Sequence, residues 1–211
     1  KTMSQIKLKH SGGNGVIIAA PSSNPAADRT LLLPSNADST IDTLDREGNI
    51  LQVKQTVKTD TFSQSMSAGG ITGAVMSLNF TPVKADSKLL IHVSANVGTS
   101  GVSGIPRTGI SLFADGSIIS GARGDTGESN QQRVASTCTG VSGSNNEYAL
   151  NNLCLMYLHT VSNTNQVTYD VRLTHLDGDS ADVLLNRMHN NSNAVFAPRA
   201  MSTITIQEVA V

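Results

Sequence analysis

The sequence contains no tryptophan and few charged or aromatic side chains. Charged residues make up 15% of the 211 positions and aromatic residues 3%, against a usual charged share of about 25%. Lysine and arginine are scattered singly, and the formal net charge is -1, so the chain has no basic stripe to neutralise phosphates. We therefore expect no nucleic-acid partner and a surface made mainly of Ser, Thr, Asn and Gly.

Long apolar runs are also absent. No segment approaches the roughly 18 consecutive apolar residues of a membrane span. The start of the chain lacks the cationic region and apolar core of a secretory signal. We expect no membrane insertion.

The chain has only two cysteines, Cys138 and Cys154. They are too few for a disulfide framework and lack the CxxC spacing of zinc or redox sites. We expect two free, buried thiols. A bridge between them stays open, because its geometry is not readable from spacing.

What the chain does have is alternation of apolar and polar residues with a period of two, which is typical of half-buried strands. Sustained helical periodicity is missing. The pattern predicts an all-β chain whose main part, residues 48–211, is an antiparallel β-sandwich head of jelly-roll-like form. The expected strands of the head are 74–80, 89–97, 153–161, 167–173 and 202–209, with a short strand at 182–185.

Asp115-Gly116 is the strongest local signal, because this pair supplies the positive φ angles of a type I′ turn. The turn predicts a hairpin in which Phe113 faces Ile118 and Leu112 faces Ile119.

The segment 153–161 is apolar on both faces. Leu153 and Leu155 lie on one face, and Met156 and Leu158 lie on the other. This is the pattern of a strand buried twice, so one face is expected to meet the core and the other a neighbouring subunit.

The turn at 162–165 predicts that the next strand, 167–173, pairs with the strand at 153–161.

His159 and His175 fall on apolar faces. We expect both to be core or interface imidazoles with a hydrogen-bond partner, not metal ligands.

Three segments of the first 62 residues contain recognisable sequence motifs: LKHSGGN at 8–14, DRTLLLP at 28–34 and ILQVKQTVKTDTF at 50–62. These segments resemble bacteriophage tail-fibre and related virion fibre proteins, and the closing strand at 201–209 does so more loosely. The resemblance implies a virion adhesin without a catalytic site. Lys1 stands in place of an initiator Met, which leaves open both a processed protein and a fragment of a longer fibre.

Residues 1–47 contain few large apolar side chains, and a chain shorter than roughly 40 residues rarely forms a core alone. Three copies around an axis would complete that core. We therefore predict a short interlocked β stem over 1–47 and a homotrimer.

The sequence offers little for catalysis or metal binding. Asp177, Asp179 and Asp182 lie close together, but Gly178 breaks the EF-hand order and a polar turn is the favoured interpretation. An ion at these three residues is left open. No HExxH or GxSxG motif occurs, and no carboxylate pair is evident. We predict a protein that is not an enzyme and that has no cofactor and no metal site.

Two polar loops of the head, 142–148 and 187–193, are the candidate receptor-binding sites. Their amide side chains offer both donors and acceptors, which suits a host surface polysaccharide or an outer-membrane protein. The candidate residues are Asn145, Asn146, Tyr148, Arg187, His189, Asn190 and Asn191.

Together these observations predict a phage virion fibre protein, assembled in the host cytoplasm, whose trimeric head attaches to the host by multivalent, non-covalent contacts. Its expected location is the tail fibre, beside other virion tail proteins. The alternative is a purely structural virion component, such as a capsid decoration or a baseplate protein. Polysaccharide depolymerisation is disfavoured, because the carboxylate pair is missing.

Overall fold

The computed structural model describes residues 5–19, 46–99, 107–125, 127, 130–139 and 148–211. By its contacts the chain divides into two compact units, Lys1–Ile41 and Asp42–Val211. In the first unit, β1 (Gln5–Lys9) and β2 (Gly15–Ala19) form an antiparallel hairpin. The strand expected at 28–34 lies outside the described residues.

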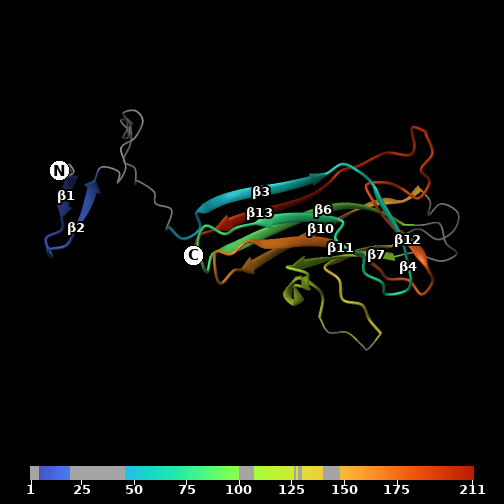
Figure 1. Cartoon of the computed structure of the whole chain (residues 1–211), viewed down its shortest axis with the longest axis horizontal. Helices are drawn as coiled ribbons and strands as arrows, with labels where there is room; N and C mark the ends of the chain where they lie inside the picture. The colour runs from blue at the N-terminus through green and yellow to red at the C-terminus, as the bar shows by residue number, and fades with distance from the viewer. Residues whose placement is uncertain (1–4, 20–45, 100–106, 126, 128–129, 140–147) are drawn as a thin grey trace. The chain divides into compact units, whose positions relative to one another are not determined.

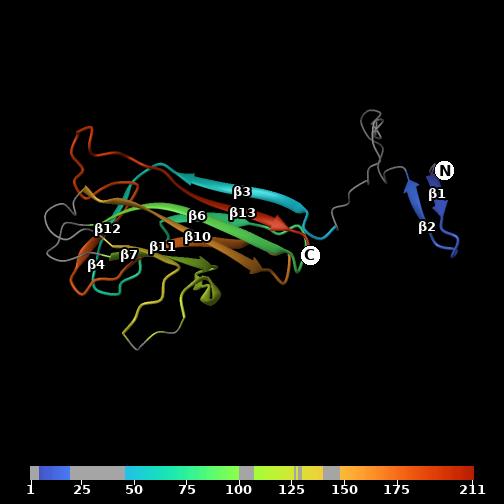
Figure 2. The same ribbon diagram turned by 180° about the vertical axis from the view of Figure 1, so that it is seen from behind.

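The strands in the described part of the second unit are arranged as two sheets, and a 3₁₀ turn, η1 (Ser120–Ala122), follows β8 (Figure 1, Figure 2). One sheet has the order β3-β13-β6-β12-β4, with β10 on the other side of β6, and the second has the order β5-β11-β7-β8, with β9 also paired to β7. The pairings are antiparallel, which confirms the expected all-β class. The first sheet is made of β3 (Ile50–Lys58), β4 (Phe62–Met66), β6 (Lys88–Thr99), β10 (Leu150–Thr160), β12 (Ala181–Leu185) and β13 (Ser202–Val209), and the second of β5 (Met76–Phe80), β7 (Arg107–Ala114), β8 (Ser117–Ile118), β9 (Ser136–Thr139) and β11 (Val167–His175).

The core lies between the two sheets. On β6, every second side chain points inward and is fully buried, as the alternation predicts. Residues of β7 and β11 cover them from the second sheet. Burying each large aliphatic side chain stabilises the fold by about 1.5–3 kcal/mol. The central members of this core are Leu89, Ile91, Val93, Ile110, Leu112, Tyr169, Val171, Leu173, Ile204 and Ile206.

β6 is the central strand of the first sheet. β10 pairs along one edge of it from Leu150 to Thr160. The other edge is shared, because β13 pairs with Lys88–Ser94 and β12 with Val97–Thr99. One strand thus joins all the others of this sheet except β3 and β4, which lie outside β13 and β12.

The predicted hairpin is confirmed. Phe113 pairs with Ile118, and the amide of Ile119 donates to the carbonyl of Leu112. Asp115 and Gly116, at the turn, have φ angles of 46° and 77°, as the type I′ geometry requires.

The pairing expected across the 162–165 turn is wrong. β10 belongs to the first sheet and β11 to the second, so this turn crosses the sandwich and does not close a hairpin. Nδ1 of His159 instead lies 2.8 Å from the hydroxyl of Tyr169 across the core. Burial lowers the pKa of His159 and raises that of Tyr169, so both groups are neutral at pH 7 and the contact is a hydrogen bond between uncharged partners.

Both cysteines are free, and the expectation that both are buried is wrong for Cys154. Cys138 is half-buried on β9 and packs against the core, and burial raises the pKa of its thiol. Cys154 lies on the exposed face of β10 and donates to the side-chain oxygen of Asn152 at 3.0 Å. No disulfide joins the two cysteines, because their thiols lie on different sheets and different faces.

The side chain of Glu208, near the C-terminal end of β13, is buried. Glu208 accepts hydrogen bonds from the side chain of Gln52 at 2.6 Å, the amides of Val83 and Lys84 at 2.9 and 3.0 Å, and the hydroxyl of Ser87 at 2.7 Å. Burial acts to raise the pKa of Glu208, but these donors outweigh it, and the pKa lies below its ordinary value. The carboxylate thereby fastens the 81–87 loop to the sheet.

Replacing Glu208 by Gln should cost about 1–3 kcal/mol of unfolding free energy at pH 7, because an amide nitrogen would face donors. A carboxylate whose folded pKa is depressed adds stability above its unfolded pKa of about 4.3 and loses it as the pH falls through the folded value. Urea unfolding from pH 7 to pH 3 should therefore bring wild type and Glu208→Gln together in acid. Exposed Glu47→Gln is the control, and parallel pH curves for wild type and Glu208→Gln would contradict the assignment.

Candidate functional site

A loop rises from one end of the head between β12 and β13 (Figure 1). It covers residues 187–201 and is called the anchored loop below. Its base is Asn186, which is fully buried and has a φ of 61°. This left-handed backbone favours Asn over most side chains, which explains the residue type at the sharp end of β12.

Asn186 ties four segments together. Its side-chain amide donates to the carbonyls of Lys58 at 2.8 Å and Asp60 at 3.0 Å, on the turn between β3 and β4. Its side-chain oxygen accepts from the hydroxyl of Ser202 at 2.6 Å. Its backbone N–H donates to the carbonyl of Asn96, and its own carbonyl accepts from the amide of Ala200. The two ends of the anchored loop are therefore fixed to the sheet.

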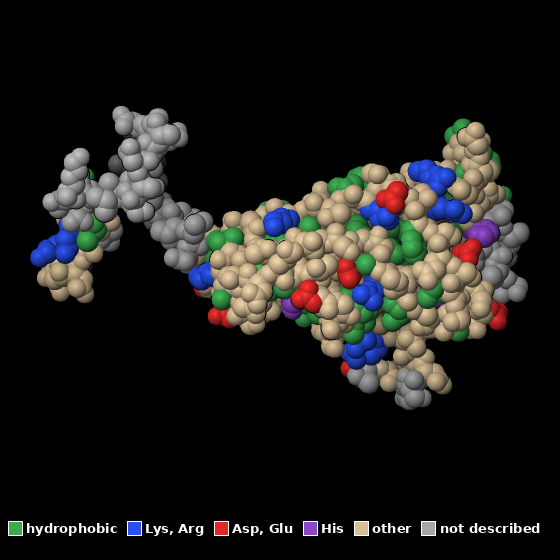
Figure 3. All heavy atoms as spheres, in the orientation of Figure 1, with side chains coloured by type: hydrophobic (Ala, Val, Ile, Leu, Met, Phe, Trp, Pro, Cys, Tyr) green, Lys and Arg blue, Asp and Glu red, His purple; other side chains and the backbone are tan. Residues whose placement is uncertain are grey.

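The tip of the anchored loop is apolar and open to solvent. A turn closed by the amide of Ala197 and the carbonyl of Ala194 presents Val195 and Phe196, which are 104% and 58% exposed. The ring of Tyr148 meets that of Phe196 edge to face, with centroids 5.8 Å apart. Figure 3 shows hydrophobic atoms at the top of this raised loop and Lys and Arg side chains below it. Rigid aromatic side chains at an exposed tip are characteristic of protein-binding surfaces.

The structure brings part of the two predicted loops together. Tyr148 ends the first loop and contacts the anchored loop, whereas Asn145 and Asn146 lie outside the described residues. Val195 and Phe196 were missed by sequence reasoning. The signal for them is the isolated apolar pair between a run of Asn and Ser and the following Pro198.

The polar candidates of the anchored loop serve largely to shape it. Arg187 folds back and donates to the carbonyls of Met188 at 3.1 Å and His189 at 3.3 Å. The side chain of Asn190 accepts from the amide of Ser192 at 3.1 Å, as in an Asx turn. Asn191 is exposed. Of these candidates, Asn191 is the one most open to a partner.

The described residues contain no group of three His, Cys, Asp or Glu side chains placed to share a metal ion. His175 is buried, and its Nε2 lies 2.6 Å from the carbonyl of Asp179, which folds the acidic turn back on the strand. Asp177 accepts from the amide of Gly178 at 2.8 Å. The predictions for His159 and His175 as hydrogen-bonded imidazoles are confirmed.

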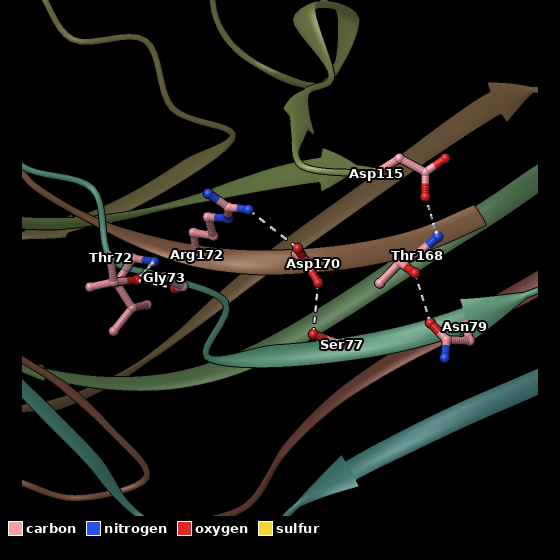
Figure 4. A network of polar contacts seen from close by, with 9 residues as sticks. Thr72, Gly73, Ser77, Asn79, Asp115, Thr168, Asp170 and Arg172 are labelled. Carbon is pink, nitrogen blue, oxygen red and sulfur yellow. Dashed lines mark hydrogen bonds and ion pairs between the residues drawn. The ribbon is translucent and has the colours of Figure 1, made fainter.

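The outer face of the second sheet is polar, and several of its side chains pair with one another (Figure 4). Asp170 accepts from the hydroxyl of Ser77 at 2.7 Å and pairs with Arg172 at 3.3 Å. The guanidinium of Arg172 lies over the ring of Phe113, 4.1 Å from its centroid. Asp170 is buried and Arg172 is largely covered, whereas Ser77 is exposed, so the network fastens neighbouring strands together.

Hollows open on the described surface. One of about 440 Å³ is lined by Gly124, Asp125 and the segment 130–134. A smaller one of about 290 Å³ lies between β3 and β5. The lining of the first includes Asp125 and Arg133, and that of the second includes the Lys58–Asp60 ion pair. Among the described residues, no helix is long and apolar enough to cross a membrane.

No family model and no curated protein matches the sequence. Among solved structures, the chain is similar to that of the infectious bursal disease virus Gt strain, at 16% identity and a TM-score of 0.41, covering 94% of this chain and 48% of that one. It is also similar to the Gx strain, at 14% identity, a TM-score of 0.40 and coverages of 93% and 48%. A third similarity is to the VP2 subviral particle of this virus, at 15% identity, a TM-score of 0.37 and coverages of 94% and 48%. The chain spans about half the length of these structures. Similarities with TM-scores this low do not assign a family or a function to the chain.

Replacing Asn186 by Ala should destabilise the head by about 3–5 kcal/mol, because buried carbonyls lose their donors and Ala tolerates the positive φ poorly. Asn186→Gly keeps the backbone permissive and should cost about 1 kcal/mol less. Urea unfolding gives both values, and hydrogen exchange in the anchored loop should quicken in each variant. An Asn186→Ala protein within about 1 kcal/mol of wild type would show that the anchor is dispensable.

Proposed function

We propose that this chain is part of a phage virion fibre and that its β head attaches the particle to the host through the anchored loop. The fibre assignment is supported by the sequence motifs at 8–14, 28–34 and 50–62, which resemble those of virion fibre proteins. The binding role is supported by the form of the head. A sandwich holds its loops at a rigid end, which is where binding residues are commonly found.

The observation that carries the attachment role is the exposed Val195-Phe196 tip with Tyr148 against it. Solvent exposure of such side chains costs free energy in the unbound state, whereas their burial under a partner is favourable. The anchor at Asn186 already restricts the backbone of the loop, so binding costs less conformational entropy. A host outer-membrane protein fits an apolar tip better than a polysaccharide does, since one phenyl and one phenol ring are the described stacking groups here.

The proposed assembly is a homotrimer joined through the N-terminal unit. In the hairpin of β1 and β2, Ile6 pairs with Ile18 and shares a face with Leu8, and these three side chains are exposed. A lone two-stranded hairpin is at best marginally stable in water. Copies packed on this apolar face would supply the missing core and present three heads together.

A second candidate function is a purely structural virion component, a capsid decoration or baseplate protein, in which the same tip contacts another virion protein. The apolar character of Val195 and Phe196 fits this role equally well. The two functions differ in what binds the tip, so cells and purified particles discriminate between them.

Light scattering of the dilute full chain should give three times the chain mass of 22.1 kDa. Leu8→Asp should reduce it to one chain mass, because burying three added carboxylates together is unfavourable. Ser11→Asp, in the turn of the same hairpin, is the matched control and should leave the mass unchanged. A single chain mass for wild type at micromolar concentration would refute the stem.

The fluorescently labelled full chain should bind saturably to at least one strain in a panel of whole bacterial cells. The double variant Val195→Asp/Phe196→Asp should bind at least about tenfold more weakly, as expected for a buried apolar anchor. Val83→Asp changes an equally exposed apolar side chain away from the tip and should bind like wild type.

Equal losses in the tip variant and in Val83→Asp would refute the tip as the binding site. Binding to purified particles that lack this protein, without binding to any cell strain, would refute attachment and favour the structural component.

A further inference from the structure

The outer face of the first sheet exposes four large apolar side chains. Met156 is 69% and Val53 54% exposed, and Val57 and Leu158 are also exposed. The ladder registers bring them onto one face across four strands. This outer face consists of Val53, Gln55 and Val57 on β3, Thr203, Thr205 and Gln207 on β13, Leu90, His92 and Ser94 on β6, and Cys154, Met156 and Leu158 on β10.

Some of the polar side chains on or beside the outer face bond to one another. The side-chain amide of Gln55 donates to the hydroxyl of Thr205 at 2.8 Å, and that of Asn152, at the margin, donates to the hydroxyl of Ser94 at 2.9 Å. Covering a polar group is costly chiefly when its hydrogen bonds to water are lost without replacement. Covering this face would therefore cost little at these side chains.

The outer face contains no Asp, Glu or Arg, and its nearest lysine along β6, Lys88, lies at the rim beside Val209 and Thr160. Two copies of the face can thus meet without placing like charges opposite each other. The second sheet is the internal contrast, because its outer face carries the Asp170–Arg172 pair. Charge depletion at the centre of a patch is a compositional mark of protein interfaces.

The size of the outer face limits how it can be used. Four strands and five residues along each strand give an area of roughly 19 Å by 17 Å, or about 320 Å² per copy. A stable interface between free partners buries about 800 Å² per partner. The face is therefore too small to hold free molecules together firmly, but it suits molecules that are already joined elsewhere, because tethering raises their effective concentration to about the millimolar range.

We propose that the outer face is where the heads of neighbouring copies of this chain meet. The inference rests on the proposed assembly, since the N-terminal unit supplies the tether. A copy of the chain meets the two requirements at once: it is held nearby, and it brings a face equally free of charge. The covered face would also explain why β10 is apolar on both sides, with Leu153 and Leu155 in the core and Met156 and Leu158 outside.

Cys154 is a built-in reporter, because its thiol lies on the outer face and is exposed in a single copy. The full chain is treated with iodoacetamide, and the Cys154 peptide is followed by mass spectrometry, which separates it from the Cys138 peptide. Cys154 of wild type should react at least about tenfold more slowly than in Val53→Lys, which places a charge on the far side of the face. Val83→Lys, the same change at a similarly exposed valine elsewhere, should match wild type.

The oligomer mass measured on the same samples separates the possible failures. A multimer whose Cys154 reacts as fast in wild type as in Val53→Lys overturns the outer-face contact and leaves the stem assembly standing. A single chain mass with fast Cys154 overturns both. Protection that arises only when purified virion proteins are added assigns the face to another partner and overturns the contact between copies.

A dilution series of wild type gives an independent test that does not depend on a folded variant. Protection of Cys154 should persist while the multimer persists and be lost where the mass falls to one chain. Protection that remains in the dissociated chain would show that the thiol is shielded within one copy, against the proposal.

Discussion

The head depends on how the long strand β6 is shared. β6 is longer than β13 or β12 alone can pair, so along one edge its hydrogen bonds pass from one strand to the other near Asn96. At that point the amide of Asn96 donates to the hydroxyl of Ser202 at 2.9 Å, and its carbonyl accepts from the amide of Asn186. No backbone group of Asn96 is left unpaired in the interior, which would be costly. The chain between Asn186 and Ser202 is forced out of the sheet there, and the anchored loop is that excursion.

The same residue therefore sets the position of the loop and contributes to the stability of the core. Asn186 needs a left-handed backbone to turn away from β6, and its side chain then fills the place where the ladder is interrupted. Glu208 does comparable work at the opposite end of β13, where it collects the amides of the 81–87 loop. A chain poor in charges uses these two buried polar side chains to fix loops that hydrophobic packing alone would leave underdetermined.

Local features of this fold follow from the sequence, and long-range ones do not. Alternation predicted which side chains of β6 face inward, and Asp115-Gly116 predicted a hairpin, because side-chain period and turn chemistry are local. The turn at 162–165 has the same composition as a hairpin turn, yet it crosses between sheets. Alternation reports which face of a strand is buried and is silent about which strand lies beside it. Tyr148 could be named from its polar loop, whereas its contact with Phe196 depends on a loop whose exit is set by Asn186.

The two apolar surfaces that one copy leaves open have different consequences. The hairpin of β1 and β2 cannot bury a core by itself, so its apolar face bears on whether the N-terminal unit folds at all. The outer face of the first sheet backs a complete core, so covering it adds stability to a head that folds without it. Its area is less than half of what free partners need, so the proposed contact between heads would depend on the tether. Such an order, with firm joining at one unit and weak contact at the other, would leave the heads able to separate and reorient while the fibre stays assembled. In the proposed attachment role that freedom would help, because three tips gain from simultaneous binding only when their spacing can adjust to it.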